Sequence, residues 1–266
     1  MKIHPTAVVD PDASLDSSVR VGPYTVIEKN VHIGPDTEIG PHSIISGPTT
    51  IGARNRIGSF ASIGAPPQDI HYQDEPTRLE IGDDNWIREY TSLHRGSPGG
   101  SGVTRIGNHN LLMAYTHVAH DCRLGNYVIM VNNAALAGHV EVGDRVTLGG
   151  LVAVQQFSRI GEFSFIGAMS GVTLDVPPYI IMAGIRNNVQ IRGINRIGLK
   201  RAGFDSLTIR NLSKAFVIIF KTPDLLLQEA LEKATTEFPD CKAVARLVQF
   251  FKDSSRNVMR LSSDGE

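Results

Sequence analysis

The residues with the clearest chemical potential lie in the middle of the chain: His117, His120, Asp121, Gly138 and His139. An imidazole acts as a general base near neutral pH. The aspartate that follows His120 can hold one ring nitrogen while the other faces a substrate, as in a triad that lacks its serine. The backbone N–H of Gly138 can approach a developing oxyanion, because glycine adds no side-chain bulk. This group predicts general-base catalysis.

Two other interpretations of the histidines stay open on spacing alone. Three imidazoles from neighbouring coils or subunits can bind zinc, which predicts a metalloenzyme. Histidines at the surface of a scaffold can also have no catalytic role at all. The three interpretations predict different outcomes for metal content and for substitution of His120.

A repeat of six residues must position this group. Aliphatic residues recur every six positions from Ile3 to Ile63, again from Ile81, and from Ile106 to Val172 after a shift of one. This period fits neither a helix nor a simple strand. It is typical of a parallel β-helix, in which three six-residue segments close one triangular coil of about 18 residues. The coils should lie about 4.8 Å apart.

Stacking of successive coils predicts which residues lie above one another. A step of one coil places His120, Gly138 and Gln156 in one column. We expect a second column beside it, formed by His117, His139 and Gln155. Polar columns on a solenoid face without a pocket of its own predict a cleft between subunits.

The chain divides into two parts. Residues 1–190 are expected to form the β-helix, with two excursion loops at about 65–78 and 94–105, and residues 191–266 an α-helical domain. The second loop is rich in glycine and serine, so it is either a functional loop on a rigid scaffold or a flexible segment.

The C-terminal part changes to helical spacing. Asp205 is a candidate N-cap for the first long helix, and further helices are expected to start at Thr222-Pro223 and at Pro239. So short a helical segment buries little on its own. We expect it to pack on the end of the solenoid or on a neighbouring subunit.

Composition excludes several classes of protein. The chain has 266 residues and a formal net charge of -1, so nothing indicates nucleic-acid binding. It has no apolar stretch long enough for a membrane span. The repeat starts at Ile3, which predicts that no signal peptide is present. Cys122 and Cys241 form no plausible disulfide framework. A cytoplasmic protein is expected.

Several segments together resemble one family. These are Glu75–Arg78, Ile87–Glu89, Leu93–Gly96, His117–Cys122, Asn132–His139, Asp175–Tyr179 and Leu199–Phe204. In this order they resemble the acyl-[acyl-carrier-protein]–UDP-N-acetylglucosamine O-acyltransferases, which catalyse the first step of lipid A biosynthesis. The resemblance covers nearly the whole chain. It implies a left-handed winding of the β-helix, which general crossover rules do not predict.

The resemblance also implies a mechanism. His120 would take a proton from the 3-hydroxyl of UDP-N-acetylglucosamine as this oxygen attacks the thioester of a 3-hydroxyacyl chain on acyl carrier protein. Asp121 would orient His120, and the Gly138 N–H would bind the oxyanion. A homotrimer with active sites between subunits is implied, without a covalent intermediate, a metal or a cofactor.

Further residues acquire roles through the same resemblance. Substrate contacts are implied for Gln68, Asp69, His71, His117, His139, Gln155, Gln156, Arg186 and Asn195. Ala168 and Met169 occupy the region that limits acyl length, where the methyl group of Ala168 replaces a glycine and predicts a shorter donor. The acidic acyl carrier protein would dock on Arg192, Arg196, Lys200 and Arg201, although these charges also fit an ordinary solvated helix face.

The chain departs from the family pattern at four places. His71 replaces a lysine, Gln155 a histidine and Ile197 a glutamate, while Gly184-Ile185-Arg186 replaces Gly-Asn-His. The resemblance implies that several of these positions contact substrate, so a 3-amino analogue of the sugar nucleotide is a second candidate acceptor. A zinc-dependent trimer resembling the γ-class carbonic anhydrases would be a different enzyme on the same fold. A non-catalytic solenoid would have no activity at all.

Overall fold

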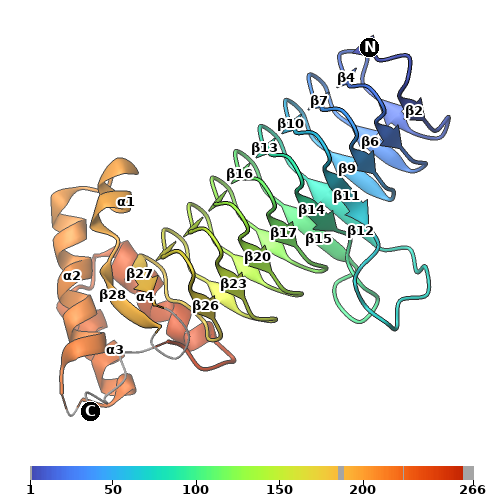
Figure 1. The fold of residues 1–266 in the computed structure, drawn as a ribbon. Coiled ribbons are helices and arrows are strands. Elements are labelled where there is room, and N and C mark those ends of the chain that lie inside the picture. Colours follow the sequence, from blue (N-terminus) through green and yellow to red (C-terminus); the bar gives the residue numbers. More distant parts are fainter. Residues whose placement is uncertain (1, 185–188, 224, 260–266) are drawn as a thin grey trace.

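The aliphatic residues of the repeat end most of the short strands, and a turn follows each of these strands. The computed structural model describes residues 2–184, 189–223 and 225–259. Three sheets form the sides of a long prism, with the N-terminus at one end and the helices at the other (Figure 1). The prism is a left-handed parallel β-helix: the repeat predicts the parallel β-helix, and the family resemblance implies its left hand.

The sheets are named here in chain order. Sheet A contains β1 (Lys2–Ile3), β4 (Arg20–Val21), β7 (Glu38–Ile39), β10 (Arg56–Ile57), β13 (Trp86–Ile87), β16 (Leu111–Leu112), β19 (Ile129–Met130), β22 (Thr147–Leu148), β25 (Phe165–Ile166), β27 (Ile180–Ala183) and β28 (Gln190–Ile194). Sheet B contains β2 (Val8–Val9), β5 (Val26–Ile27), β8 (Ile44–Ile45), β11 (Ser62–Ala65), β14 (Ser92–His94), β17 (His117–Val118), β20 (Ala135–Leu136), β23 (Ala153–Val154) and β26 (Gly171–Val172). Sheet C contains β3 (Ser14–Leu15), β6 (Val31–Ile33), β9 (Thr49–Ile51), β12 (Arg78–Ile81), β15 (Val103–Ile106), β18 (Arg123–Leu124), β21 (Glu141–Val142) and β24 (Arg159–Ile160).

The core is a set of stacked aliphatic side chains inside the prism. Ile45, Ile63 and Leu93 follow one another in sheet B and are fully buried. Burying one such side chain contributes about 1.5–3 kcal/mol, so the stack is the main source of stability. The residue before each aliphatic points outward, which places His117 on the outer face of sheet B.

The turns between sheets have a fixed geometry. The third residue after the aliphatic adopts a left-handed backbone, with φ of 61° at Asp121, 61° at His139 and 66° at Phe157. The residue before it has a backbone N–H that points away from the coil. In the first coils proline often occupies that position, for example Pro23 and Pro41, and proline has no N–H to satisfy.

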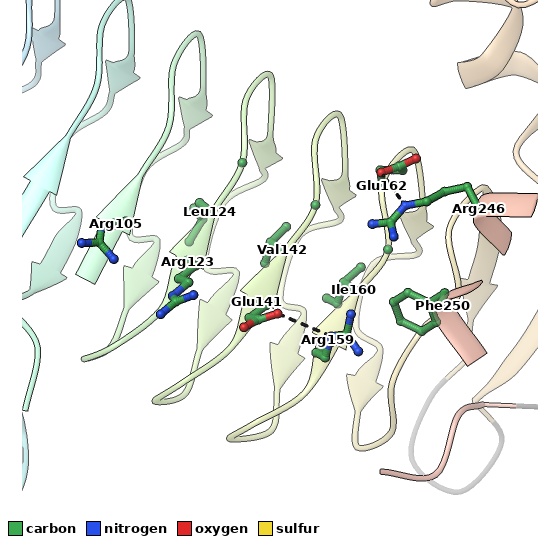
Figure 2. Close-up of a pocket in the computed structure, with 13 residues that line it drawn as sticks. Arg105, Arg123, Leu124, Glu141, Val142, Arg159, Ile160, Glu162, Arg246 and Phe250 are labelled. Carbon is green, nitrogen blue, oxygen red and sulfur yellow. Dashed lines mark hydrogen bonds and ion pairs between the residues drawn. The ribbon is translucent and has the colours of Figure 1, made fainter. Parts of the chain in front are cut away.

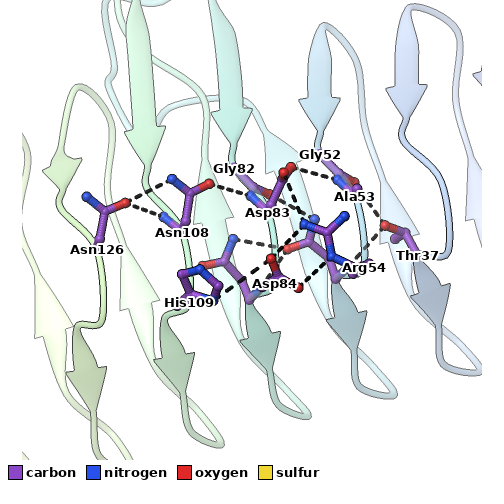
Figure 3. Close-up of polar contacts among 12 residues, drawn as sticks. Thr37, Gly52, Ala53, Arg54, Gly82, Asp83, Asp84, Asn108, His109 and Asn126 are labelled. Atoms are coloured by element: carbon purple, nitrogen blue, oxygen red, sulfur yellow. Dashed lines mark hydrogen bonds and ion pairs between the residues drawn. The ribbon is translucent and has the colours of Figure 1, made fainter.

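On the corner between sheets C and A, side chains satisfy these N–H groups instead. Oxygen atoms of Asp83, Asn108, Asn126 and Asp144 each accept the N–H of the equivalent residue one coil earlier, at 2.7–2.9 Å. Figure 3 shows this Asx ladder from Ala53 through Asp83 and Asn108 to Asn126.

Two excursion loops leave the coil on one side, between β11 and β12 and between β14 and β15 (Figure 1). The buried Arg95 connects them. Its guanidinium donates to the backbone oxygen of Gly47 at 2.7 Å and to the hydroxyl of Tyr72 at 2.9 Å. The same group lies 5.6 Å from the centre of the Tyr72 ring.

The C-terminal part starts with a strand. Strand β28 pairs antiparallel with β27 and lies across the expected boundary at residue 190. The helices follow: α1 (Arg196–Arg201), α2 (Ser206–Lys221), α3 (Leu227–Glu237) and α4 (Lys242–Asp253). In the part of the chain that is described, no helix is long and apolar enough to cross a membrane.

The helix starts agree only in part with the prediction. Asp205 caps α2, because its carboxylate accepts the Thr208 N–H at 2.8 Å. The predicted start of α3 at Thr222-Pro223 is wrong, since the Glu229 side chain accepts the N–H of Leu226 and closes the first turn there. Helix α4 likewise starts at Lys242 rather than at Pro239.

Candidate active site

The site is built on the corner between sheets B and C, where His120 and Asp121 follow strand β17. The Nδ1 atom of His120 lies 3.0 Å from Oδ2 of Asp121. The carboxylate is almost fully buried, and the imidazole remains partly accessible. An ionised carboxylate accepts a proton-bearing Nδ1, which leaves Nε2 as the open, basic nitrogen.

Residues of the second excursion loop hold the carboxylate of Asp121. Oδ2 also accepts the Ser97 N–H at 2.9 Å and its hydroxyl at 2.6 Å, and Oδ1 lies 3.3 Å from the Ser101 hydroxyl. Burial alone would raise the pKa of Asp121, but the hydrogen bonds from His120 and Ser97 hold it well below its ordinary value. Asp121 is therefore ionised at neutral pH.

Gly138 lies one coil above His120, as the repeat predicts. A Cβ atom at this position would lie 2.5 Å from Cε1 and 2.7 Å from Nε2 of the His120 ring. A side chain at this position would therefore force the imidazole of His120 to move. The Gly138 N–H donates to no backbone atom in the described part of the chain, and no ladder like that of Figure 3 covers it.

His139 lies above Asp121 in the neighbouring column. Its Nε2 atom is 3.8 Å from Oδ2 of Asp121, and its ring meets the His120 ring edge-on at 5.1 Å between centroids. The other face of the ring stacks on Phe157 at 4.5 Å. Burial lowers the pKa of His139, so the ring is mainly neutral at neutral pH.

The predicted column of His117, His139 and Gln155 is wrong. His117 pairs with Ala135, and Ala135 pairs with Ala153, all on the outer face of sheet B. His139 lies in the turn, because it is four residues beyond one full coil from His117. Only the column of His120, Gly138 and Gln156 follows the predicted step.

His117 has partners that its position in the repeat did not predict. Its Nδ1 atom lies 2.7 Å from the Ser92 hydroxyl, and its ring meets that of His94 edge-on at 4.9 Å. Burial lowers the pKa of His117. Burial also lowers the pKa of His94 to about 4, and repulsion by His117 and His120 adds to this effect. Ser92 lies one coil before His117, which could have predicted their contact. The excursion loop between these two residues lengthens the step from 18 to 25 residues and hides this relation in the sequence.

The first excursion loop brings a further group to the same region. Oδ1 of Asp69 accepts the His71 N–H at 2.9 Å, which lowers the pKa of Asp69, and attraction by His120 adds a small effect. His71 and Gln68, in the same loop as Asp69, are exposed. Gln155 and Gln156, in the turn after β23, are also exposed. Arg186 lies outside the described residues.

The zinc interpretation gains no support from the arrangement. Within the described residues, His120, Asp121 and His139 form a group whose potential ligand atoms lie within 4.8 Å of one another. His117 is not part of that group, since its Nδ1 atom faces Ser92. Among the described residues of one chain, His117, His120 and His139 therefore do not converge on one ion.

Two grooves lie beside the site on sheet C. One of about 290 Å³ is lined by Ser101, Asp121, Arg123, His139, Glu141, Phe157, Arg159, Ser255 and Arg256. The other, of about 360 Å³, lies between sheet C and α4, and its side chains include Arg123, Arg159, Arg246 and Phe250 (Figure 2). Ion pairs join Arg159 to Glu141 and Arg246 to Glu162 there, so much of the charge in this groove is neutralised.

Other predicted residues lie away from His120. Ala168 and Met169 are exposed on the corner between sheets A and B. Asn195 caps α1, accepting the Gly198 N–H at 3.1 Å and donating to the Phe163 carbonyl at 2.8 Å. Its amide is therefore already engaged within the chain.

A cationic groove lies between α1 and α2. It has a volume of about 450 Å³, and its lining includes Arg196, Lys200, Arg210 and Lys214. Two of these residues were predicted, while Arg210 and Lys214 were missed because they belong to the next helix. Arg192 and Arg201 are exposed but are not among the residues that line it.

Two family models match parts of the chain. Residues 175–259 match the family model described as UDP N-acetylglucosamine O-acyltransferase, domain 2, and residues 30–65 and 104–138 match that of the bacterial transferase hexapeptide. The chain is 55% identical over 259 residues to an acyl-[acyl-carrier-protein]–UDP-N-acetylglucosamine O-acyltransferase of Alkalilimnicola ehrlichii, covering 97% of this chain and 99% of that protein. An enzyme of the same name from Janthinobacterium sp. is 50% identical over 262 residues, with coverage of 97% and 99%.

Solved structures give the same result. LpxA from Acinetobacter baumannii superposes with a TM-score of 0.93 at 41% identity, covering 97% of this chain and 99% of that one. The Arabidopsis UDP-N-acetylglucosamine acyltransferase superposes with a TM-score of 0.77 at 35% identity, with the same coverage. The chain therefore belongs to the acyl-[acyl-carrier-protein]–UDP-N-acetylglucosamine O-acyltransferase family and is an acyltransferase.

Proposed function

We propose that the protein transfers a 3-hydroxyacyl chain from acyl carrier protein to the 3-hydroxyl of UDP-N-acetylglucosamine, with His120 as the general base. Nε2 of His120 takes the hydroxyl proton while the sugar oxygen attacks the thioester carbonyl. The tetrahedral intermediate then collapses, its carbon–sulfur bond breaks, and the imidazolium returns the proton to the leaving thiolate. The ester and the free carrier thiol are the products.

The observation that carries this proposal is the pairing of an oriented imidazole with an unpartnered amide. Asp121 holds Nδ1 of His120, and the Gly138 N–H is free of backbone acceptors one coil above, within the described residues. Equivalent N–H groups in other turns, for example those of Ser59, Ala114 and Asn132, also donate to no acceptor among the described residues, so Gly138 is distinguished by its place against the imidazole of His120. A free N–H beside the base is what an oxyanion requires.

Substitution of His120 tests the mechanism. A His120→Ala variant should lose about 10²–10⁴-fold in kcat, the contribution typical of a general base. Gly138→Ala should also lose activity, because the new methyl group displaces the imidazole. His109→Ala, on the far corner beside Asp84, is the matched control and should retain turnover. Unchanged turnover in His120→Ala would leave the non-catalytic solenoid as the better explanation.

A homotrimer with shared sites is part of the proposal. Exposed apolar side chains lie on both corners that flank sheet B, with Phe157 at the corner of the site and Leu151 and Met169 at the opposite corner. A neighbouring subunit would cover them and enclose the reacting groups. Light scattering should give three chains per particle, whereas a fully active monomer would contradict a site completed by a second chain.

The cationic groove between α1 and α2 is the proposed docking site for acyl carrier protein. Arg196, Lys200, Arg210 and Lys214 concentrate positive charge there, which suits an acidic partner. Lys200→Glu should raise KM for the acyl donor several-fold without changing KM for the sugar nucleotide. If Lys200→Glu and the wild type have the same KM for the acyl donor at low salt, this groove is not the docking site.

Ala168 is the proposed limit to acyl length. The outer face of sheet B between His117 and this corner carries small side chains, Ala135, Ala153 and Gly171, over which a chain can lie. By strand spacing, Ala168 lies roughly 13 Å along the axis from His120. Ala168→Gly should shift the products of a mixed-donor assay to longer chains, as read by mass spectrometry. An unchanged product distribution would place the limit elsewhere.

The acceptor is the remaining element of the proposal. His71 is largely exposed and forms a local pair with Asp69, so it can rearrange toward a ligand. Competition between UDP-N-acetylglucosamine and its 3-amino analogue, in the wild type and in His71→Lys, decides the acceptor. Preference for the amino sugar would replace the ester by an amide as the product.

A further inference from the structure

The second excursion loop packs against the carboxylate of Asp121 beside His120. Ser97 donates both its amide and its hydroxyl to Oδ2, at 2.9 Å and 2.6 Å. This is the same oxygen that meets Nδ1 of His120 at 3.0 Å. Three donors therefore converge on one carboxylate oxygen.

The rest of the loop is fitted to the same carboxylate. A Cβ atom on Gly100 would lie 2.4 Å from Cγ of Asp121, so the backbone approaches the carboxylate as closely as glycine permits. The Asp121 N–H donates to the Thr104 hydroxyl at 2.8 Å, on the strand that the loop enters. Ser97 is 2% exposed, so bulk solvent has little access to its hydroxyl.

We propose that Ser97 is a positioning residue for acyl transfer, acting through Asp121 on the basicity and aim of His120. This inference rests on the proposed general-base function. The two Ser97 donors fix the rotation of the carboxylate, so that Oδ2 points at the imidazole. They also share its negative charge, which limits how strongly Asp121 retains a proton on the ring.

The direction of the effect follows from these contacts. Without the Ser97 hydroxyl, more of the carboxylate charge is available to the imidazolium, which binds its proton more tightly. The acid limb of kcat/KM should then move to higher pH. The freed carboxylate also rotates, so kcat at the optimum should fall about 10- to 100-fold, the loss expected for one hydrogen bond to a charged group.

The test compares pH profiles of four variants. Ser97→Ala should show the shifted acid limb and the lower kcat, and Ser97→Thr, which keeps the hydroxyl, should restore both. Ser97→Cys keeps the size but donates weakly, and it should fall between them. Ser164→Ala is the matched control, because its buried hydroxyl donates to the Pro177 carbonyl at 2.8 Å, far from the site.

The outcomes separate structure from positioning. Ser164→Ala should lower the melting temperature without moving the pH profile. A Ser97→Ala profile that coincides with the wild type would overturn the proposal, and so would an equal shift in Ser164→Ala. If Ser97→Ala does not fold, the other two variants decide the question: Ser97→Cys should show a shifted acid limb and a lower kcat than Ser97→Thr, and equal profiles would overturn the proposal. His120→Ala in the same assay shows whether the general-base function itself fails.

Discussion

At the scale of single residues, the site depends on close packing of polar groups at one turn. Asp121 and His139 both adopt left-handed backbone angles, which brings their side chains into adjacent levels of one column. The His120 ring fills the space that Gly138 leaves open. Each group is fixed by its neighbour, so small changes should have large effects on catalysis.

The buried His94 predicts a dependence of stability on pH. Its pKa is lowered from 6.5 to about 4, chiefly by burial, so between these values the unfolded chain binds a proton that the folded chain does not. The free energy of unfolding should therefore fall as pH decreases from 6.5 to 4, by at most about 3 kcal/mol from this residue. The full contribution should be present above pH 6.5.

Urea unfolding at constant protein concentration measures this effect. His94→Leu should show a smaller decrease in the free energy of unfolding between pH 7 and pH 4 than the wild type does. The decrease should not vanish, because burial also lowers the pKa of His117 and His139. His32→Gln, on the exposed face of sheet C, should keep the full dependence. An unchanged slope in His94→Leu would show that its imidazole is protonated in the folded state.

At the scale of elements, the repeat predicted the coils but not the path of the excursion loops. Aliphatic spacing determines which residues enter the core, and hence the turn that carries His120 and Asp121. Ser97 could not be found this way, because a loop rich in glycine and serine has no periodicity to relate it to the coil. The insertion between His94 and Arg105 also changes the step that would have revealed the contact of Ser92 with His117.

The error over His117 and His139 has a related cause. Proximity in the sequence suggested one column, but a column requires a step of a whole coil. The predicted starts of α3 and α4 are too early, because the prediction treats proline as the first helical residue. In the structure it precedes the helix by several residues.

Arg95 predicts a coupling between the two excursion loops. It donates to the Gly47 and Gly64 carbonyls and to the Tyr72 hydroxyl, while Tyr72 donates to the Glu75 carbonyl. Arg95→Lys keeps the charge but cannot reproduce this fork. The loop that carries Asp69 should then loosen, and the free energy of unfolding should fall by about 2 kcal/mol.

Steady-state kinetics measures the functional part of this effect. Arg95→Lys should raise KM for the sugar nucleotide more than KM for the acyl donor, since Gln68 and Asp69 are proposed to contact the former. Arg88→Lys is the control, because Arg88 forms a partly exposed pair with its neighbour Glu89. An equal rise in both KM values would indicate general damage rather than loosening of one loop.

At the scale of the whole molecule, stability is distributed along one axis. Each coil contacts chiefly the coils before and after it, so a local defect should stay local. The Asx ladder offers a test, because Asn108 joins two neighbouring coils: it accepts the Asp83 N–H at 2.7 Å, and its own N–H is accepted by Asn126 at 2.9 Å. Asn108→Ala removes the side-chain acceptor of the Asp83 N–H, while the backbone N–H of residue 108 can still donate to Asn126.

Hydrogen exchange should show a defect confined to the coils around this ladder. In Asn108→Ala, peptides containing the Asp83 amide should exchange faster, because water replaces a fixed acceptor at a net cost of about 1 kcal/mol. Peptides from α4 should not change, and turnover should stay within about twofold of the wild type. Asn132→Ala is the control, since Asn132 occupies the same place in its turn on the corner between sheets A and B. Faster exchange in α4 would mean that the solenoid and the helices unfold as one cooperative unit.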